Sequence, residues 1–234
     1  MQKIMDMNEK ISSLENFFHE KIRQQAAQHL IQQDPDLAKI IQKEGLCRLK
    51  FDLQKEPYEA LARAIAGQQL HSKAVEAIIS RLLILNNGTF PSPKQMAGFS
   101  HEQLARCGFS MRKAMALQHL AQATLDNKVP NRQQANEMSD QELIDILTQL
   151  HGIGRWSVEM LLIFTLGRLD IMPVDDFGVR EGWRLCKNLP IQPKPKILRQ
   201  ATESWSPYRS IGAWYLWRAV EQFKPKQKQN PLTL

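Results

Sequence analysis

Long hydrophobic runs, paired cysteines and alternating apolar patterns are scarce in this sequence of 234 residues. Even the apolar run at residues 160–164 is far shorter than the roughly 20 residues that a membrane span needs. The N-terminus has no apolar core of the signal-peptide type. The three cysteines, Cys47, Cys107 and Cys186, lie far apart and form neither a metal-binding nor a disulfide pattern. We therefore expect a soluble, intracellular protein that does not bind membranes.

Negative charge is also in short supply. The 31 Lys and Arg residues outnumber the 24 Asp and Glu residues, which gives a net charge of +7 and a pI near 9.4. Such a balance favours a polyanionic partner such as nucleic acid, although many basic proteins bind none.

Helical periodicity is present almost everywhere, and strand-like alternation is essentially absent. Ser100 with Gln103, and Ser139 with Glu142, form capping boxes that mark helix starts. We predict an all-α protein. The expected helices cover residues 11–22, 35–41, 57–65, 74–83, 100–108, 110–127, 139–150, 157–166, 176–187 and 206–224.

A Gly-Ile-Gly connector at residues 152–154 separates two of these helices. An ordinary turn needs only one glycine, so two suggest a backbone bared for close approach to a ligand. Backbone N–H groups at the start of the following helix, where the dipole favours an anion, suit a phosphate. The alternative is a plain turn between two antiparallel helices.

Four motifs together carry a family resemblance. "LHGIGRWSVEM" at 150–160, followed by "MPVDDFGV" at 172–179, resembles the helix-hairpin-helix and aspartate signature of base-excision DNA glycosylases. The match is closest to the alkylation-repair branch, the 3-methyladenine DNA glycosylase II type. "RAIAGQQLHSKAVEAI" at 63–78 and "WSPYRSIGAWYLW" at 205–217 agree with that branch. We expect the protein to lack the N-terminal β-rich domain of the larger bacterial members, since the sequence is similar to the compact ones.

The resemblance implies a two-lobed helical fold with the active-site cleft between the lobes. Residues 58–173 would form the helix-hairpin-helix lobe, and residues 1–57 with 174–234 the other. The expected activity is hydrolysis of the N-glycosidic bond of alkylated purines in duplex DNA by base flipping, which leaves an abasic site. The substrate would be 3-methyladenine, with 7-methylguanine a further candidate. We expect a monomer that binds double-stranded DNA, in the cytoplasm and nucleoid of a prokaryote or in a eukaryotic nucleus.

The aspartate pair at 175 and 176 is the candidate catalytic group. Cleavage builds positive charge on the sugar, which a carboxylate near C1′ stabilises. The family pattern places the catalytic acid three residues before a buried aliphatic residue, which is Val179 for Asp176 but Gly178 for Asp175. We therefore predict Asp176 as the catalytic residue, with Asp175 as second choice and as the helix cap. The alternative is that both are caps or surface acids.

A tryptophan stands where related enzymes with lyase activity carry a lysine. Those enzymes form a Schiff base through that amine, whereas this sequence reads Gly154-Arg155-Trp156. No four-cysteine cluster follows, so we expect no iron–sulfur cluster. These features favour a monofunctional hydrolase. An oxidised- or mismatched-base glycosylase and a non-catalytic DNA-binding module are the alternatives, disfavoured by Trp156 and by the acid at 176.

The resemblance also implies contacts to the substrate base and to DNA. A flipped base stacks on aromatic faces, and a cationic purine gains a cation–π attraction there. The expected substrate-binding residues are Trp156, Trp217, Trp205 and Tyr208, while Trp214 is expected in the core. The expected DNA-binding residues are Gln68, Gln69, Leu70, His71, Gly152, Gly154, Arg155, Ser157, Arg209 and Ser210. One of Gln69, Leu70 and His71 would be the wedge that fills the gap left by the flipped nucleotide.

Arg112 and Lys113 are further candidate phosphate contacts, and the alternative for both, as for Arg209 and Ser210, is a solvated surface residue. No cofactor is expected to be required. The resemblance implies a monovalent cation held by the backbone carbonyls of Thr148, Leu150 and Ile153.

Overall fold

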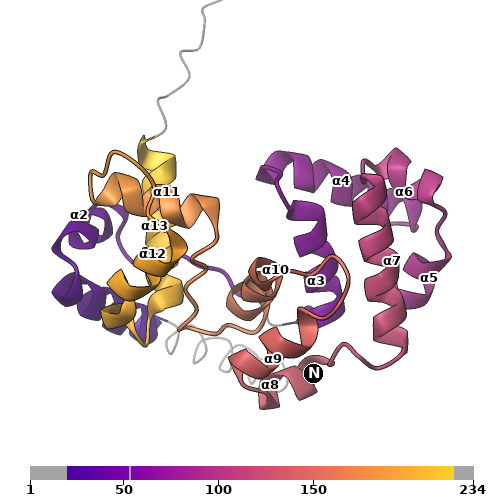
Figure 1. Cartoon of the computed structure of the whole chain (residues 1–234), viewed down its shortest axis with the longest axis horizontal. Coiled ribbons are helices and arrows are strands. Elements are labelled where there is room, and N and C mark those ends of the chain that lie inside the picture. The colour runs from indigo at the N-terminus through magenta and orange to yellow at the C-terminus, as the bar shows by residue number, and fades with distance from the viewer. Residues whose placement is uncertain (1–19, 53, 224–234) are drawn as a thin grey trace, which may run out of the picture. The chain divides into compact units, whose positions relative to one another are not determined.

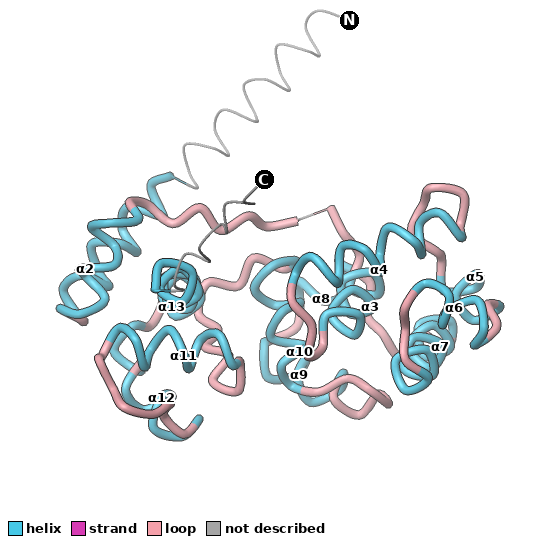
Figure 2. Tube along the Cα trace, turned by 90° about the horizontal axis from the view of Figure 1, so that it is seen from above, coloured by secondary structure: helices cyan, strands magenta, loops and turns pink. Residues whose placement is uncertain are grey.

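The computed structural model describes residues 20–52 and 54–223, and within them every regular element is a helix (Figure 2). The predicted all-α class is confirmed. No helix in this described part combines the length and hydrophobicity that crossing a bilayer requires. The chain divides into two compact units, one built from the residues up to Leu49 and from Leu169 onward, the other from Lys50–Arg168. The predicted cleft between two lobes stays a prediction.

The second unit holds most of the helices, coloured purple to red-brown in Figure 1. In chain order they are α3 (Pro57–Gly67), α4 (Ser72–Leu85), α5 (Pro93–Gly98), α6 (His101–Cys107), α7 (Met111–Leu125), α8 (Arg132–Glu137), α9 (Asp140–Leu147), α10 (Arg155–Met160) and the π-helix η1 (Leu161–Thr165). Helix α7 packs against α3, α5 and α6, and α10 packs against α3 and α9. Leu61, Ile65, Leu117 and Leu120 are fully buried and form part of the core of this unit.

Helix starts in this unit follow the capping signals in the sequence. Ser100 and Ser139 each accept a hydrogen bond from the N3 backbone N–H and complete a capping box, as predicted. Two further boxes, at Ser92 and Asn131, begin α5 and α8. Each such cap is worth about 1 kcal/mol, so these short helices begin where the sequence directs. Periodicity did not predict that the helix after the hairpin changes to π geometry at Leu161.

The first unit combines both ends of the described chain. Its elements are a helix over residues 20–33, α2 (Pro35–Glu44), α11 (Phe177–Cys186), α12 (Pro195–Ala201), the 3-10 turn η2 (Glu203–Trp205) and α13 (Arg209–Phe223). The predicted helix at 11–22 lies mostly outside the described residues.

The last helix begins later than the sequence predicted. It was expected to open at Ser206-Pro207, but α13 begins at Arg209. The carboxylate of Asp170 accepts hydrogen bonds from the Ser206 hydroxyl at 2.8 Å and from the Arg209 backbone N–H at 3.3 Å. A side chain distant in sequence therefore supplies the cap, which no local pattern could reveal.

The chain passes from one unit to the other twice, and each connecting segment packs with only one of them. Asp52 donates its backbone N–H to Phe164, and Arg132 donates to the carbonyls of Asp52 and Lys55, so residues 50–52 and 54–57 pack with the second unit. Ile171 donates to Ser210, which attaches residues 169–173 to the first unit. The sequence prediction placed both boundaries later, after 57 and after 173.

Helices α11 and α13 form the most extensive packing in the first unit, and Gly182 allows it. A Cβ built on Gly182 would lie 2.0 Å from the Leu216 carbonyl oxygen, far inside van der Waals contact. The contact is with backbone, so no side-chain rotation can relieve it.

We expect Gly182→Ala to lower the free energy of unfolding by about 1–3 kcal/mol, because the two helices must separate to admit one methyl group. Thermal or urea denaturation measures this. Gly98→Ala is the matched control, since a Cβ there meets nothing within 4 Å, and it should change stability by less than about 0.5 kcal/mol. Equal stability of both variants would contradict the packing argument.

Candidate active site and DNA-binding surface

The two hairpin glycines serve different purposes. Gly152 has a φ of +82°, and a Cβ on it would lie 2.4 Å from the Cβ of Ala116 on α7. Gly154 has nothing within 4 Å of the corresponding position. The close approach at Gly152 is therefore to the protein's own helix, which corrects the expectation that both glycines are bared for a ligand. Gly154 alone keeps that character.

Helix α10 starts without a side-chain cap. Gly154 is its N-cap and donates no side-chain group, and no proline occupies the first turn. The preceding helix, α9, by contrast has a complete capping box at Ser139. The first N–H groups of a helix have no intrahelical acceptor and carry the positive end of the dipole, so an uncapped start is suited to a phosphate.

Two polar side chains on α10, Ser157 and Arg155, make hydrogen bonds within the protein. Ser157 is fully buried, and its hydroxyl accepts a hydrogen bond from Gln68, so the prediction that its side chain contacts DNA is wrong. Arg155 pairs with Glu159, with 2.9 Å between Nε and Oε1, and Glu159 is only 1 % exposed. The Arg155 side chain is still 38 % exposed, so its contact with DNA stays a prediction.

Residues 67–71 connect α3 to α4 and are called the wedge loop here, after their predicted role. Hydrogen bonds fix the backbone at both ends of this loop. His71 caps α4, with its Nδ1 accepting the Ala74 N–H at 3.3 Å. Gln69 has a φ of +58° and is exposed, and Leu70 is 42 % exposed. His71 is engaged as a cap, and wedge side chains are frequently apolar, so Leu70 is the preferred candidate of the three residues that the sequence left open, with Gln69 as the second.

Gln68 and Lys113 make contacts within the protein. The Gln68 side-chain amide donates to the Gly152 carbonyl at 3.0 Å and to the Ser157 hydroxyl at 3.2 Å. The Lys113 ammonium donates to the Ala66 and Gln68 carbonyls, each at 2.8 Å, and burial lowers its pKa. These hydrogen bonds occupy the Gln68 amide nitrogen and two of the three Lys113 donors, while both residues keep some exposed surface. Contacts of Gln68 with DNA and of Lys113 with phosphate stay predictions.

In the first unit, Asp176 occupies the N-terminus of α11. Its Oδ1 accepts two hydrogen bonds of 2.8 Å, one from the Val179 backbone N–H and one from the Trp217 indole Nε1. Asp176 is thus the helix cap, and the prediction that Asp175 has this role is wrong; Asp175 is exposed. A Cβ on Gly178 would lie 2.9 Å from the Trp217 Cδ1 and 3.1 Å from the Asp176 Oδ1, so any other residue there would displace the indole or the carboxylate.

Trp205 belongs to the core. It has no exposed surface, its ring centroid lies 5.5 Å from that of Trp183, and its ring lies so close to Gly212 that a Cβ there would be 2.3 Å away. The prediction that Trp205 contacts the substrate base is therefore wrong. Tyr208 is partly exposed, with its ring edge-on to His29 at 5.5 Å. Its role in substrate binding stays a prediction.

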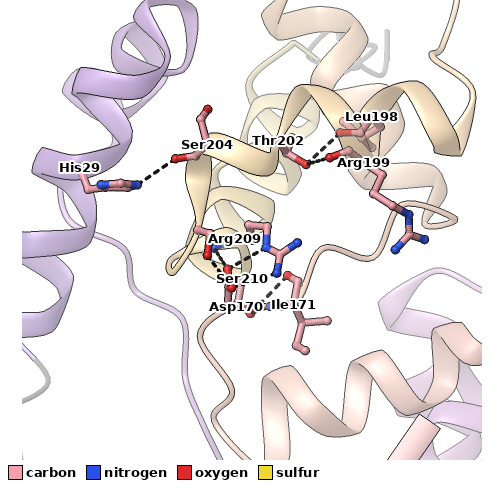
Figure 3. Close-up of polar contacts among 10 residues, drawn as sticks. His29, Asp170, Ile171, Leu198, Arg199, Thr202, Ser204, Arg209 and Ser210 are labelled. Atoms are coloured by element: carbon pink, nitrogen blue, oxygen red, sulfur yellow. Dashed lines mark hydrogen bonds and ion pairs between the residues drawn. The ribbon is translucent and has the colours of Figure 1, made fainter. Parts of the chain in front are cut away.

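Arg209 and Ser210 fasten the start of α13 to the segment before the aspartate pair, as Figure 3 shows. The Arg209 guanidinium binds the Asp170 carboxylate through Nε at 2.7 Å and Nη2 at 2.9 Å. Burial acts to raise the pKa of Asp170, but these hydrogen bonds and the one from Ser206 outweigh it and hold that pKa below its usual value. Ser210 is fully buried and accepts the Ile171 N–H, so the predicted contact of its side chain with DNA is wrong.

Comparison with known proteins agrees with this geometry. Residues 62–207 match the family described as HhH-GPD superfamily base excision DNA repair proteins. The chain belongs to this helix-hairpin-helix superfamily. The resemblance inferred from the four sequence motifs is confirmed.

Named relatives are similar over most of the chain. DNA-3-methyladenine glycosylase 1 of Schizosaccharomyces pombe is 44 % identical over 192 residues, 81 % of this chain and 84 % of that protein. The alkylbase DNA glycosidase-like protein mag2 of the same yeast is 36 % identical, over 82 % of this chain and 92 % of its own. A solved structure of the S. pombe 3-methyladenine DNA glycosylase in complex with abasic DNA superposes with a TM-score of 0.81, at 42 % identity, and covers 84 % of this chain and 97 % of that one.

One exposed aromatic residue was missed by the sequence analysis. Phe177 directly follows Asp176, begins α11 and is 68 % exposed. Exposure of a large ring beside the candidate catalytic acid makes it a further candidate for stacking on a base. The sequence could have indicated this exposure. Phe177 and Val179 are two positions apart, so they lie on nearly opposite faces of α11, and Val179 lies on the buried face.

We expect the two hairpin glycines to respond differently to alanine. Gly152→Ala should lower the free energy of unfolding by about 2 kcal/mol or more, because it combines a positive φ with a clash against Ala116. Gly154→Ala should leave the melting temperature almost unchanged and weaken binding to damaged and undamaged duplexes alike, since a phosphate contact reads no base. Thermal melts and fluorescence anisotropy measure these effects. A loss of affinity for damaged DNA alone would contradict the phosphate role.

Proposed function

We propose that this protein is a monofunctional DNA glycosylase that hydrolyses the N-glycosidic bond of 3-methyladenine, and of 7-methylguanine as a second substrate, in duplex DNA. The observation that carries the proposal is the Asp176 carboxylate, whose Oδ1 is oriented by two N–H donors at the start of α11. The names of the relatives, which are DNA-3-methyladenine glycosylases, support the same activity.

The proposed chemistry needs one well-placed negative charge. When the C1′–N bond breaks, its electron pair leaves with the cationic purine, which becomes neutral, and positive charge develops on the sugar. Asp176 stabilises that charge and orients the water that adds to C1′ and loses a proton. A cationic base is already a good leaving group, so little help from a general acid is required.

The residue after the hairpin supports hydrolysis without strand cleavage. A lyase step requires an amine that attacks C1′ to form a Schiff base. This chain has Trp156 there, a half-buried side chain on α10 whose ring lies 4.0 Å from the position of a Cβ on Gly67. An indole cannot act as that nucleophile, but its face can stack on a flipped, positively charged purine.

The proposed partner is double-stranded DNA. The uncapped start of α10 at Gly154 would bind a backbone phosphate, and Leu70 would fill the space vacated by the flipped nucleotide. We propose that the protein acts as a monomer where genomic DNA is held, the nucleoid or the nucleus.

Backbone carbonyls of the hairpin are the proposed ligands of a monovalent cation. The Thr148 hydroxyl donates to the Ile144 carbonyl, so this side chain turns back onto α9 and leaves the backbone oxygen as the potential ligand. The Leu150 carbonyl accepts the Ile153 N–H and retains a second lone pair. We propose that Thr148, Leu150 and Ile153 would hold the ion through neutral oxygens, a ligand set suited to a weakly hydrated monovalent cation. The bound ion would add positive charge beside the phosphate site.

Asp176→Asn should lower the rate of 3-methyladenine release by at least about 100-fold, because it removes the charge that opposes the developing cation. Asparagine is an equally good N-cap and can keep Oδ1 as the acceptor of both N–H groups, so stability and duplex affinity should change little. Single-turnover release of methylated bases, thermal melts and anisotropy measure these quantities.

Asp175→Asn is the matched control, since it removes the same charge from the exposed neighbour, and it should retain most of the activity. An inactive Asp175→Asn beside an active Asp176→Asn would move the catalytic role by one residue.

Cationic lesions should be cleaved much faster than neutral ones such as hypoxanthine, because neutral purines are poor leaving groups. Trp156→Ala should cost more on 3-methyladenine than on hypoxanthine, by no more than about 3 kcal/mol in transition-state stabilisation, the scale of stacking plus cation–π attraction. Single-turnover rates on duplexes that differ only in the lesion measure both. Equal wild-type rates on the two lesions would exclude recognition of charge and leave the dimensions of the binding site as the selector.

A further inference from the structure

Lys113 neutralises the end of a helix that leads into the wedge loop. Helix α3 ends at Gly67, and its last carbonyls lack intrahelical partners and carry the negative end of the dipole. The Lys113 ammonium, projecting from the first turn of α7, donates to the Ala66 and Gln68 carbonyls at 2.8 Å each. A partly buried ammonium bonded to two carbonyls fixes the path of the backbone at the point where the loop begins.

The same loop is bonded to the hairpin. The Gln68 side chain donates to the Gly152 carbonyl at 3.0 Å and to the buried Ser157 hydroxyl at 3.2 Å. Lys113 holds the backbone of Gln68, and Gln68 holds the hairpin. These contacts join α7, the end of α3 and the hairpin into one network within the second unit.

Leu70 lies two residues beyond this network, in a loop with hydrogen bonds on both sides of it. Its backbone N–H donates to the Gly67 carbonyl at 3.1 Å, and the next residue, His71, caps α4. The left-handed conformation of Gln69 turns the chain between them. The exposure of Leu70 is therefore determined by contacts on both sides of it.

We infer that Lys113 and Gln68 are positioning residues that set the location of the Leu70 wedge relative to the hairpin. The inference rests on the proposed function, in which the hairpin holds a phosphate while the wedge enters the duplex. The DNA backbone has a fixed geometry, so a wedge displaced by about 1 Å enters poorly, and such displacements cost up to about 100-fold in rate. Neither side chain needs to touch DNA for this role.

The test compares Lys113→Met and Gln68→Leu with the wild-type chain. Both replacements keep the approximate length of the side chain and remove its hydrogen bonds. Lys94→Met, on the exposed surface of α5, is the control for the loss of one positive charge. The measurements are single-turnover release of 3-methyladenine, fluorescence of 2-aminopurine placed beside an abasic-site analogue as the readout of wedge insertion, and anisotropy with undamaged duplex across a range of salt.

We expect Lys113→Met and Gln68→Leu each to lower the release rate by about 10- to 100-fold, to reduce the insertion signal, and to leave undamaged-duplex affinity within about twofold. Lys113→Arg should retain most of the activity, since it keeps the donors. The double variant should release 3-methyladenine at nearly the same rate as the slower of the two single variants, because both residues support one loop and their effects are not additive. Lys94→Met should match the wild type in all of these measurements.

Two results would overturn the inference. One is a fall in affinity for every duplex with a salt dependence reduced by about one charge, which would make Lys113 a phosphate contact. The other is unchanged release and insertion in both variants. A thermal melt identifies a variant that fails to fold, and the other variant then carries the test. A wild-type protein that releases no alkylated base would refute the proposed function, whereas insertion at the abasic analogue would still test the network.

Discussion

The hydrogen bonds to Oδ1 of Asp176 hold the candidate catalytic acid in place, and much of the first unit is arranged to permit them. One comes from the backbone N–H of Val179 and places the carboxylate at the start of α11, and the other comes from the indole of Trp217 on α13. The second bond requires α11 and α13 to pack closely, which the glycines at 178 and 182 allow by presenting no Cβ to Trp217 and Leu216. The orientation of the Asp176 carboxylate therefore depends on glycine at positions 178 and 182.

The second unit meets a related requirement with polar contacts. The hairpin approaches α7 through Gly152, and Gln68 and Lys113 bond the wedge loop to the hairpin and to α7. Rigid placement suits the proposed function, in which the hairpin holds a phosphate and Leu70 enters the same duplex, because the DNA sets the distance between the two. The acceptors in this network are mainly backbone carbonyls, so no acidic side chain is needed to pair with Lys113.

Several polar residues that a family motif associates with DNA turn out to hold the protein together. Ser210 and Arg209 fasten α13 to the segment before the aspartate pair, and Ser157 accepts a hydrogen bond from Gln68. A motif records which positions matter but does not distinguish a residue that touches the ligand from one that supports a neighbour. Burial decides between the two, and burial is a property of the packed chain.

The sequence by itself determined the helical class, most helix starts and the family, because capping residues and 3.6-residue periodicity act over a few neighbouring positions. It also singled out Asp176 through its spacing to a buried aliphatic residue, and Trp156 through its place after the hairpin. Only the tertiary structure showed that Asp176 is itself the cap of α11, that Trp205 is core, and that Asp170 supplies the cap of α13 from 39 residues away. The network of Lys113, Gln68 and Gly152 was equally hidden, since its members are separated by up to 84 residues in the chain. Such contacts arise when distant segments are packed against one another, and no local pattern of residue types encodes which side chain will then face which carbonyl.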